Sequence, residues 1–530
     1  MLRPLKLSAL MLLGTAAAAL AADPQRGGTL VFTAPYGSSF ATMDIQSSPQ
    51  TQDEIPALAI QRSLYKWDSS SNQPVLDLAE SLEVSEDGLT YTYHLKPGVV
   101  FHDGSPMTAD DIIWSYERIA NPANAFPGGR YFDTLAGITE FRSGAAEHIA
   151  GLRKIDDMTL AMEFTVAADP AFDLLTRQAS IYPSDKGADH NWGTDPVGLG
   201  PFKFVKHVPG SVVETERFDQ FYEEGKPYLD KVNIVIMEDA SARDVAFRNK
   251  EIDASVLGAN QYVAYQADAE LAKNILEVAE MFTRNVGFSP KHAPFADKRV
   301  RQAVNLAIDS ELIIKKLVKD KAYRAVSWLP TSSPEFDKDA KPFPYDPEKA
   351  KALLAEAGYP DGFEFELTAT QNESWGIPIV EAIIPMLAKV GIKAVAKPVE
   401  SSVLSEVIPA GDFQAYMWSN NSGPDALSTL RCFYSKTAQS ACNYTAYNSP
   451  EFDRLFEAAL AERDPAKRSD LLRQANNELQ DGAPVWFFNY NKAVMAYQPW
   501  VHGLQPNATE MAIQDFVDVW IDDTAPASRR

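Results

Sequence analysis

The fold is decided by residues 363–398, which read FEFELTATQNESWGIPIVEAIIPMLAKVGIKAVAKP. Apolar and charged residues alternate at the start of this stretch, as they do in a strand with one buried face. An apolar run over about 374–389 then has the length of a helix, and a glycine closes it. A second strand is expected over 392–399, followed by a helix near 402–409 and a strand over 413–418. This order predicts an α/β layer with parallel strands.

A second informative stretch covers residues 91–111, YTYHLKPGVVFHDGSPMTADD. Its first residues alternate as in a strand, and a Lys-Pro-Gly turn follows. Thr108 is placed to cap a helix, and Asp111 three residues later completes a capping-box pattern. The N-terminal half therefore also mixes strands with helices.

Length and charge restrict the class of protein. A chain of 530 residues is too long for one ordinary core, so two or three domains are expected. Hydrophobic residues make up 45% and charged residues 23%, which is typical of globular proteins. The formal net charge is −23, and a surface this negative repels nucleic acid and anionic lipid.

Residues 1–21 have the pattern of a secretory signal peptide. Arg3 and Lys6 precede a short apolar run, and small residues around Ala21 fit a cleavage site. The run is too short to cross a bilayer, although a buried N-terminal helix is an alternative. Because no cysteine follows the cleavage site, no lipid anchor is expected there. We therefore predict an exported protein of the bacterial periplasm.

The two cysteines of the chain are Cys432 and Cys442. In an oxidising compartment, two nearby cysteines in a polar loop predict a disulfide. Free thiols or metal ligands are the alternatives, but the cysteine and histidine clusters that zinc requires are missing around them.

Common catalytic signatures are absent from the sequence. It contains no Gly-x-Ser-x-Gly elbow, no His-Glu-x-x-His and no phosphate-binding glycine loop. His94 and His102 lie close in sequence, but a metal site needs further converging ligands, so structural roles are favoured. The sequence predicts a binding protein without metal or cofactor rather than an enzyme.

The stretch 91–111 closely resembles a signature of the extracellular solute-binding proteins of family 5, which include oligopeptide- and dipeptide-binding proteins of ABC transporters. Further matches follow in the family's order along the mature chain, at 198–202, 225–230, 249–253, 297–303 and 448–453. The resemblance implies an α/β clamshell of the periplasmic-binding-protein type, with two lobes joined by a hinge and a third, inserted domain. It implies lobe one at 22–60, 190–286 and 492–530, an inserted domain II at 61–189, and lobe two at 287–491.

The resemblance also directs attention to Trp418. In peptide-binding relatives a tryptophan is followed three residues later by an aspartate that holds the peptide's α-ammonium group, but here that position is Asn421. An amide cannot replace a carboxylate as counter-ion. Asp425 is close enough in sequence to compensate, and Asn420 and Asn421 could instead form a simple turn. Peptides therefore compete with sugars, polyols and other amide- or hydroxyl-rich solutes as the predicted ligand.

Other predicted ligand contacts are aromatic. Trp375 lies in a strand-to-helix loop, where ligands of α/β proteins bind. Tyr36 and Phe40, after the first strand, would face it from lobe one, and Tyr490 lies near a predicted crossing between the lobes.

The leading interpretation is a monomeric periplasmic binding protein that delivers a small polar solute to the permease subunits of an ABC importer. A secreted glycan hydrolase, which needs two carboxylates at a defined separation, is an alternative. A periplasmic chaperone or signalling receptor with the same clamshell is another.

Overall fold

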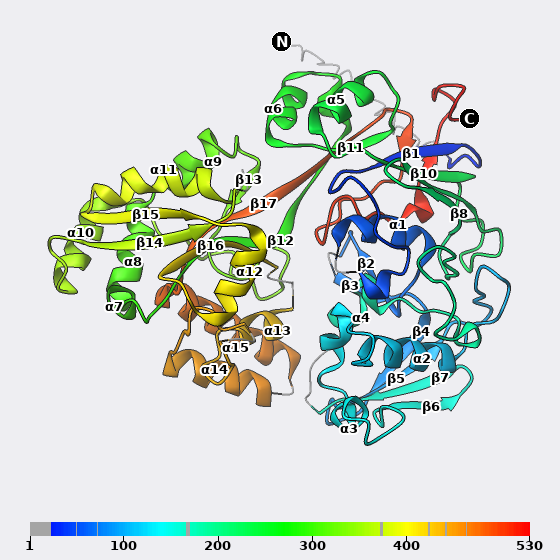
Figure 1. Cartoon of the computed structure of the whole chain (residues 1–530), viewed down its shortest axis with the longest axis horizontal. Helices are drawn as coiled ribbons and strands as arrows, with labels where there is room; N and C mark the ends of the chain where they lie inside the picture. Colours follow the sequence, from blue (N-terminus) through cyan, green and yellow to red (C-terminus); the bar gives the residue numbers. More distant parts are fainter. Residues whose placement is uncertain are drawn as a thin grey trace, which may run out of the picture.

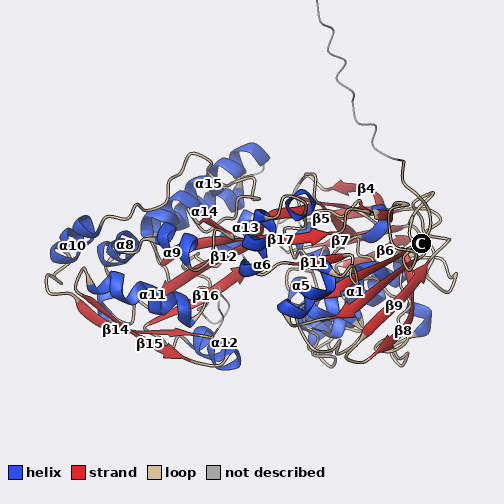
Figure 2. Ribbon diagram, turned by 90° about the horizontal axis from the view of Figure 1, so that it is seen from above, coloured by secondary structure: helices blue, strands red, loops and turns tan. Residues whose placement is uncertain are grey.

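The computed structural model describes residues 23–48, 50–71, 73–165, 170–371, 375–421, 425–439, 442–462 and 464–530. The predicted signal peptide lies outside these residues. Figure 1 shows a clamshell: lobe two lies on one side, lobe one and domain II lie on the other, and long strands connect the halves at one end. The same two halves are separate in the view from above (Figure 2). The predicted fold class is confirmed.

Lobe one is built on a four-stranded sheet of order β1-β10-β9-β8, in which β1 and β10 are parallel and the other pairs antiparallel. Its core includes Phe32, Phe202 and Phe516. The elements of lobe one are β1 (Thr29–Ala34), α1 (Thr51–Ile60), β8 (Phe202–Val208), β9 (Val212–Arg217), β10 (Lys231–Ile236), α5 (Ala240–Arg248), β11 (Ala254–Val256), α6 (Ala259–Ala267), β18 (Val501–His502) and β19 (Trp520–Ile521).

Domain II contains a second, antiparallel sheet of order β4-β5-β7-β6. The capping box predicted at its main helix is present, because the Asp111 carboxylate accepts a hydrogen bond from the Thr108 main-chain N–H at 2.7 Å. The elements of domain II are β2 (Tyr65–Asp68), β3 (Gln73–Leu76), β4 (Ala79–Val84), β5 (Thr90–Leu95), α2 (Ala109–Ala120), α3 (Ile138–Arg142), β6 (Leu152–Asp156), β7 (Thr159–Glu163) and α4 (Ala171–Leu174).

Lobe two confirms the strand–helix prediction. β14 pairs in parallel with both β15 and β16, and α11 packs against β15 and β14 in a core that includes Phe365 and Ile383. The elements of lobe two are α7 (Ala293–Ala296), α8 (Lys298–Ala307), α9 (Ser310–Lys316), β13 (Ala322–Arg324), α10 (Pro347–Glu356), β14 (Phe363–Ala369), α11 (Ile377–Ala388), β15 (Ile392–Pro398), α12 (Ser401–Ala410), β16 (Ala415–Asn421), α13 (Ala426–Arg431), α14 (Pro450–Ala461) and α15 (Pro465–Gly482).

Two long strands form the connection between the halves. β12 (Ile275–Phe288) and β17 (Val485–Tyr497) are antiparallel and belong to a mixed sheet that runs from lobe one into lobe two, of order β11-β17-β12-β16-β14-β15, with β13 also paired to β17. Their pairing is interrupted between Ala279 and Thr283, and the register shifts there. This break gives the hinge a place where backbone angles can change without disrupting either half.

Candidate functional site

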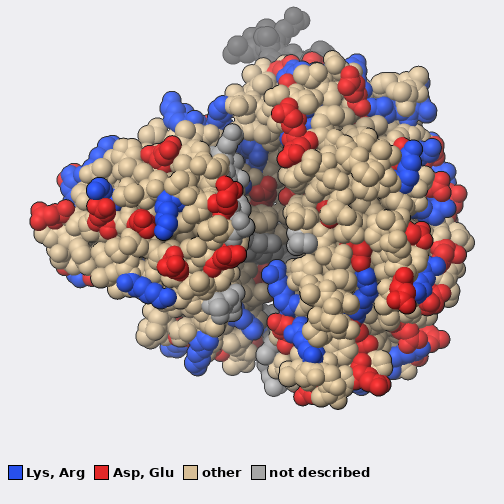
Figure 3. Space-filling model, in the orientation of Figure 1, with Lys and Arg blue, Asp and Glu red and all other residues tan. Residues whose placement is uncertain are grey.

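A furrow separates lobe two from lobe one and domain II, and acidic and basic side chains are both visible inside it (Figure 3). The predicted aromatic pair lies together on lobe two. The rings of Trp375 and Trp418 meet edge to face, with their centroids 5.6 Å apart. Both side chains are only partly buried. They meet because Trp418 lies on β16 and Trp375 follows β14, and these two strands are neighbours.

Amide side chains continue from this pair toward the hinge. Asn420 lies opposite Thr283 in the β16–β12 pairing, and its Oδ1 accepts a hydrogen bond from Asn285 Nδ2 at 2.9 Å. Asn285 and Asn489 are fully buried, and within the described chain Asn285 Oδ1 and both polar atoms of the Asn489 side chain have no hydrogen-bond partner. The sequence analysis identified Asn420 but missed Asn285 and Asn489, because an isolated asparagine in a strand carries no local signal.

The two remaining predicted polar contacts have different outcomes. Asn421 ends β16, where its backbone pairs with Phe282, but its side chain lies outside what the structure describes. Asp425 caps α13, and its carboxylate accepts hydrogen bonds from the N–H groups of Leu427 at 3.3 Å and Ser428 at 2.8 Å. The Asp425 carboxylate therefore has a structural role at this helix start.

Lobe one contributes Tyr36, as predicted. Its side chain is 43% exposed and its hydroxyl donates a hydrogen bond to the Glu510 carboxylate. The two residues line a hollow of about 260 Å³, whose other residues are Gln50, Thr51 and Gln52. Burial, reinforced by the negative charge of Glu280, raises the pKa of Glu510 to about 7. The sequence analysis missed Glu510, which lies far from Tyr36 along the chain.

Phe40 and Tyr490 are core residues in this structure. Phe40 is 3% exposed and packs in the core of lobe one, with its ring 5.7 Å from that of His207. Tyr490 is fully buried, and its hydroxyl lies 2.8 Å from the carbonyl oxygen of Ser327 and 2.9 Å from that of Leu329. The structure thus does not bring these two aromatics to the tryptophan pair.

The predicted disulfide between Cys432 and Cys442 is confirmed, and it closes a loop beside α13 in lobe two. In the part of the chain that the structure describes, no group of three or more His, Cys, Asp or Glu side chains is arranged to hold a metal ion. No helix of the described residues combines the length and apolar character needed to cross a membrane.

Comparisons with known proteins agree with the architecture. The dipeptide-binding protein of Escherichia coli K12 is 27% identical over 512 residues, covering 91% of this chain and 93% of its own. The heme-binding protein A of Haemophilus influenzae is 28% identical over 457 residues, covering 79% of each chain. The solved structure of HbpA2 from Haemophilus parasuis superposes with a TM-score of 0.81 at 23% identity, over 93% of this chain and 100% of the other.

The family profile decides the assignment. The profile described as bacterial extracellular solute-binding proteins, family 5 (middle region), matches residues 73–441, which is more than half of the chain. The curated relatives are named as binding proteins and not as enzymes, and their names indicate chemically different ligands. The chain belongs to the bacterial extracellular solute-binding proteins of family 5.

Proposed function

We propose that this protein captures a small polar solute between its two lobes and delivers it to the permease of an ABC importer in the bacterial periplasm. The observation that carries the proposal is the furrow between two halves that are joined by the interrupted pair β12 and β17. Such a hinge lets the lobes close over a ligand and exclude water from it. A monomer is sufficient for this role.

The proposal includes the domain boundaries given by the resemblance. Lobe one comprises 22–60, 190–286 and 492–530, the inserted domain II comprises 61–189, and lobe two comprises 287–491. The break in the β12–β17 pairing lies at the edge of these segments, next to Glu280 on β12 and Asn491 on β17, which supports a hinge there.

The chemistry of the lobe-two wall favours a polar ligand without a required ammonium group. Trp375 and Trp418 offer partly exposed aromatic faces for stacking, and Asn420 offers a directional amide next to them. Asn421 supplies no negative charge, and Asp425 is already engaged by two main-chain N–H groups. We propose a sugar-like, polyol-like or peptide-like solute whose amine, if it has one, contributes little affinity.

Calorimetry with a panel of sugars, polyols and di- to pentapeptides tests this proposal. At least one class should bind wild type without turnover, and Trp418→Ala should weaken that binding by about 2 kcal/mol or more if the ring stacks on the solute. Asn421→Asp should weaken a neutral ligand, because it adds a charge that must be desolvated. Tight peptide binding that disappears on N-terminal acetylation would contradict the ligand assignment. Hydrolysis of an oligosaccharide by the purified protein would contradict the binding role itself.

A further inference from the structure

Arg284 is a buried cation on β12, in the connection between the two halves. It lies on β12 just after the break in the β12–β17 pairing and is 8% exposed. Its Nη1 donates a hydrogen bond to Asn491 Oδ1 at 2.9 Å, while its Nε is buried without a partner among the described residues. Among the described residues, no carboxylate oxygen lies within 4.0 Å of the Arg284 guanidinium nitrogens, which is the distance limit for an ion pair. The Arg284 guanidinium therefore has one neutral partner, the Asn491 amide oxygen, although a guanidinium can donate two parallel hydrogen bonds to a carboxylate.

Other buried arginines of this chain are satisfied differently. Arg62 lies 3.1 Å from an Asp515 oxygen, and Arg529 lies 2.7 Å from an Asp253 oxygen. Arg243 donates hydrogen bonds to two main-chain carbonyl oxygens, those of Met237 at 2.7 Å and Glu238 at 2.6 Å. A buried cation without such compensation costs several kcal/mol, so a structural role alone does not explain Arg284.

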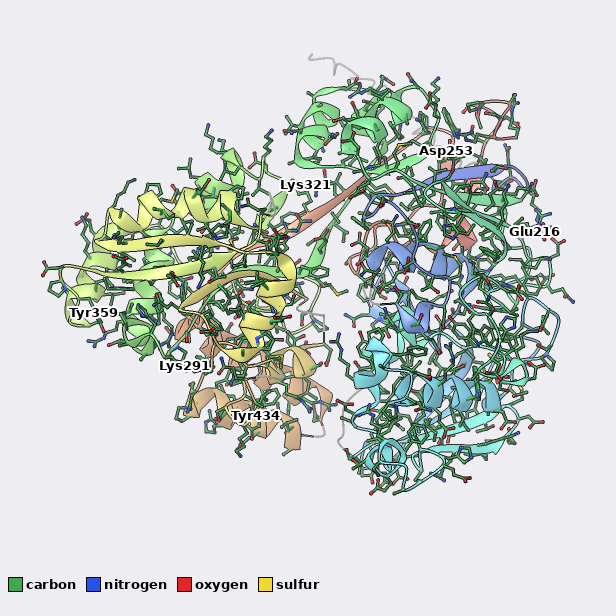
Figure 4. The ribbon with its side chains drawn as sticks, in the orientation of Figure 1. Glu216, Asp253, Lys291, Lys321, Tyr359 and Tyr434 are labelled. Atoms are coloured by element: carbon green, nitrogen blue, oxygen red, sulfur yellow. A yellow bond between two sulfur atoms is a disulfide. The ribbon has the colours of Figure 1, made fainter. Side chains whose placement is uncertain are left out.

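Lys321 is a second cation at the same place. It directly precedes β13, whose Ala322 pairs with Asn491, the residue that holds Arg284. Figure 4 shows Lys321 beside β17 at the junction of the two halves. Its ammonium group makes no hydrogen bond or ion pair to any part of the chain that the structure describes. Burial lowers the pKa of Lys321 to about 8, as expected for a cation that lacks a counter-ion at contact distance.

Two carboxylates lie near Arg284 and Lys321, but neither forms an ion pair with these cations in the described chain. Glu280, in the break, and Glu510, on lobe one, are near enough to influence Lys321 but form no ion pair with it or with Arg284 in the described chain. Glu510 is instead bonded to Tyr36. The nearby Lys492 has its own partners, because its Nζ lies 3.5 Å from Glu277 and 3.2 Å from the Tyr262 hydroxyl.

We propose that Arg284 and Lys321 form a subsite for a carboxylate group of the solute. The proposal rests on the function proposed above and narrows its ligand to an organic acid, such as a sugar acid or an N-blocked peptide. A guanidinium binds a carboxylate through two parallel hydrogen bonds, and the lysine adds a point charge. The flanking Glu280 and Glu510 favour a monoanion over a phosphate dianion, because a second negative charge would be repelled by them. Closure of the lobes would bring the Tyr36–Glu510 wall over this subsite.

The test uses two matched pairs of probes. Calorimetry compares gluconate with glucitol, and N-acetyl-dialanine with its C-terminal amide, on wild type, Arg284→Gln and Lys321→Gln. Lys393→Gln serves as control, since Lys393 pairs with Glu364 on the exposed edge of lobe two. In at least one pair the acid should bind wild type roughly ten- to hundredfold more tightly than the uncharged probe. Arg284→Gln and Lys321→Gln should each lose most of this preference, and the control should keep it.

Each other outcome has a definite meaning. Equal binding of acid and uncharged probe, binding of uncharged probes alone, or an acid preference that survives both substitutions overturns the carboxylate subsite and leaves the proposed function intact. Failure of these probes and of the whole sugar and peptide panel to bind overturns the proposed function, and the subsite with it. If Arg284→Gln does not fold, Lys321→Gln decides, because Lys321 is only half-buried.

Discussion

The His102 side chain joins domain II to lobe one in a way that predicts an acid-sensitive junction. Its ring accepts a hydrogen bond at Nδ1 from the Gly198 N–H at 3.3 Å, and its Nε2 lies 3.0 Å from the Gly200 carbonyl oxygen. This arrangement requires the neutral ring, because a proton on Nδ1 would face the Gly198 N–H. Burial, with a contribution from Lys203, lowers the pKa of His102 to about 4. The structural role favoured for His102 from the sequence is confirmed.

The sign and size of the effect follow from this pKa. An unfolded histidine titrates near 6.5, so His102 contributes stability that is present above that pH and lost as the pH falls toward 4. The loss amounts to about 3 kcal/mol when complete. Urea denaturation measures how much the free energy of unfolding falls between pH 7 and pH 4.5. This decrease should be smaller for His102→Gln than for wild type by roughly 2 kcal/mol.

A second histidine gives the control for this experiment. The exposed His148 is paired with Glu117, which raises the pKa of His148, so its contribution is present at low pH and lost as the pH rises through that pKa. His148→Gln should therefore not reduce the loss of stability on acidification. Identical pH dependence of wild type and His102→Gln would refute the argument, whatever the absolute stability of the variant.

Three further predictions concern the scaffold and the hinge. Replacing Cys432 and Cys442 by serine should lower the free energy of unfolding by about 2–3 kcal/mol, measured by denaturation, with little change in ligand affinity; two titratable thiols in the native, unreduced protein would contradict the bond. A Cβ at Gly200 would lie 2.3 Å from the Ala59 carbonyl oxygen, so Gly200→Ala should cost roughly 1–3 kcal/mol by the same measurement, and an unchanged midpoint would exclude this crowding. Small-angle scattering should show compaction with a saturating ligand, and an unchanged radius with a verified ligand would argue against lobe closure.

The fold was predictable where its signals are local. The alternation at 363–367, the helix-length apolar run and the second strand sufficed to place β14, α11 and β15 in a parallel layer. Local signals failed at the hinge strands. The sequence analysis did not predict β12, one of the two strands that join the halves, and the other, β17, reaches Tyr497. Both strands are buried between neighbours in the sheet for much of their length, so they lack the one-sided alternation that marks a half-exposed strand.

Some residues of the candidate site could be predicted from the sequence and others could not. Trp375 could be identified because it lies in the loop after a parallel strand, where ligands of α/β proteins bind, and Trp418 because the family resemblance points to it. Phe40 was predicted as a ligand contact because it follows a strand, but it lies in the core of lobe one. A single sequence does not distinguish an aromatic residue that faces a core from one that faces a furrow. The role proposed for Arg284 could not be predicted, because the residues next to an arginine in the sequence do not show whether it will be buried without a carboxylate partner. The carboxylates that pair with Arg62 and Arg529 come from positions far away along the chain. Only the three-dimensional structure shows that Arg284 has no such partner among the described residues.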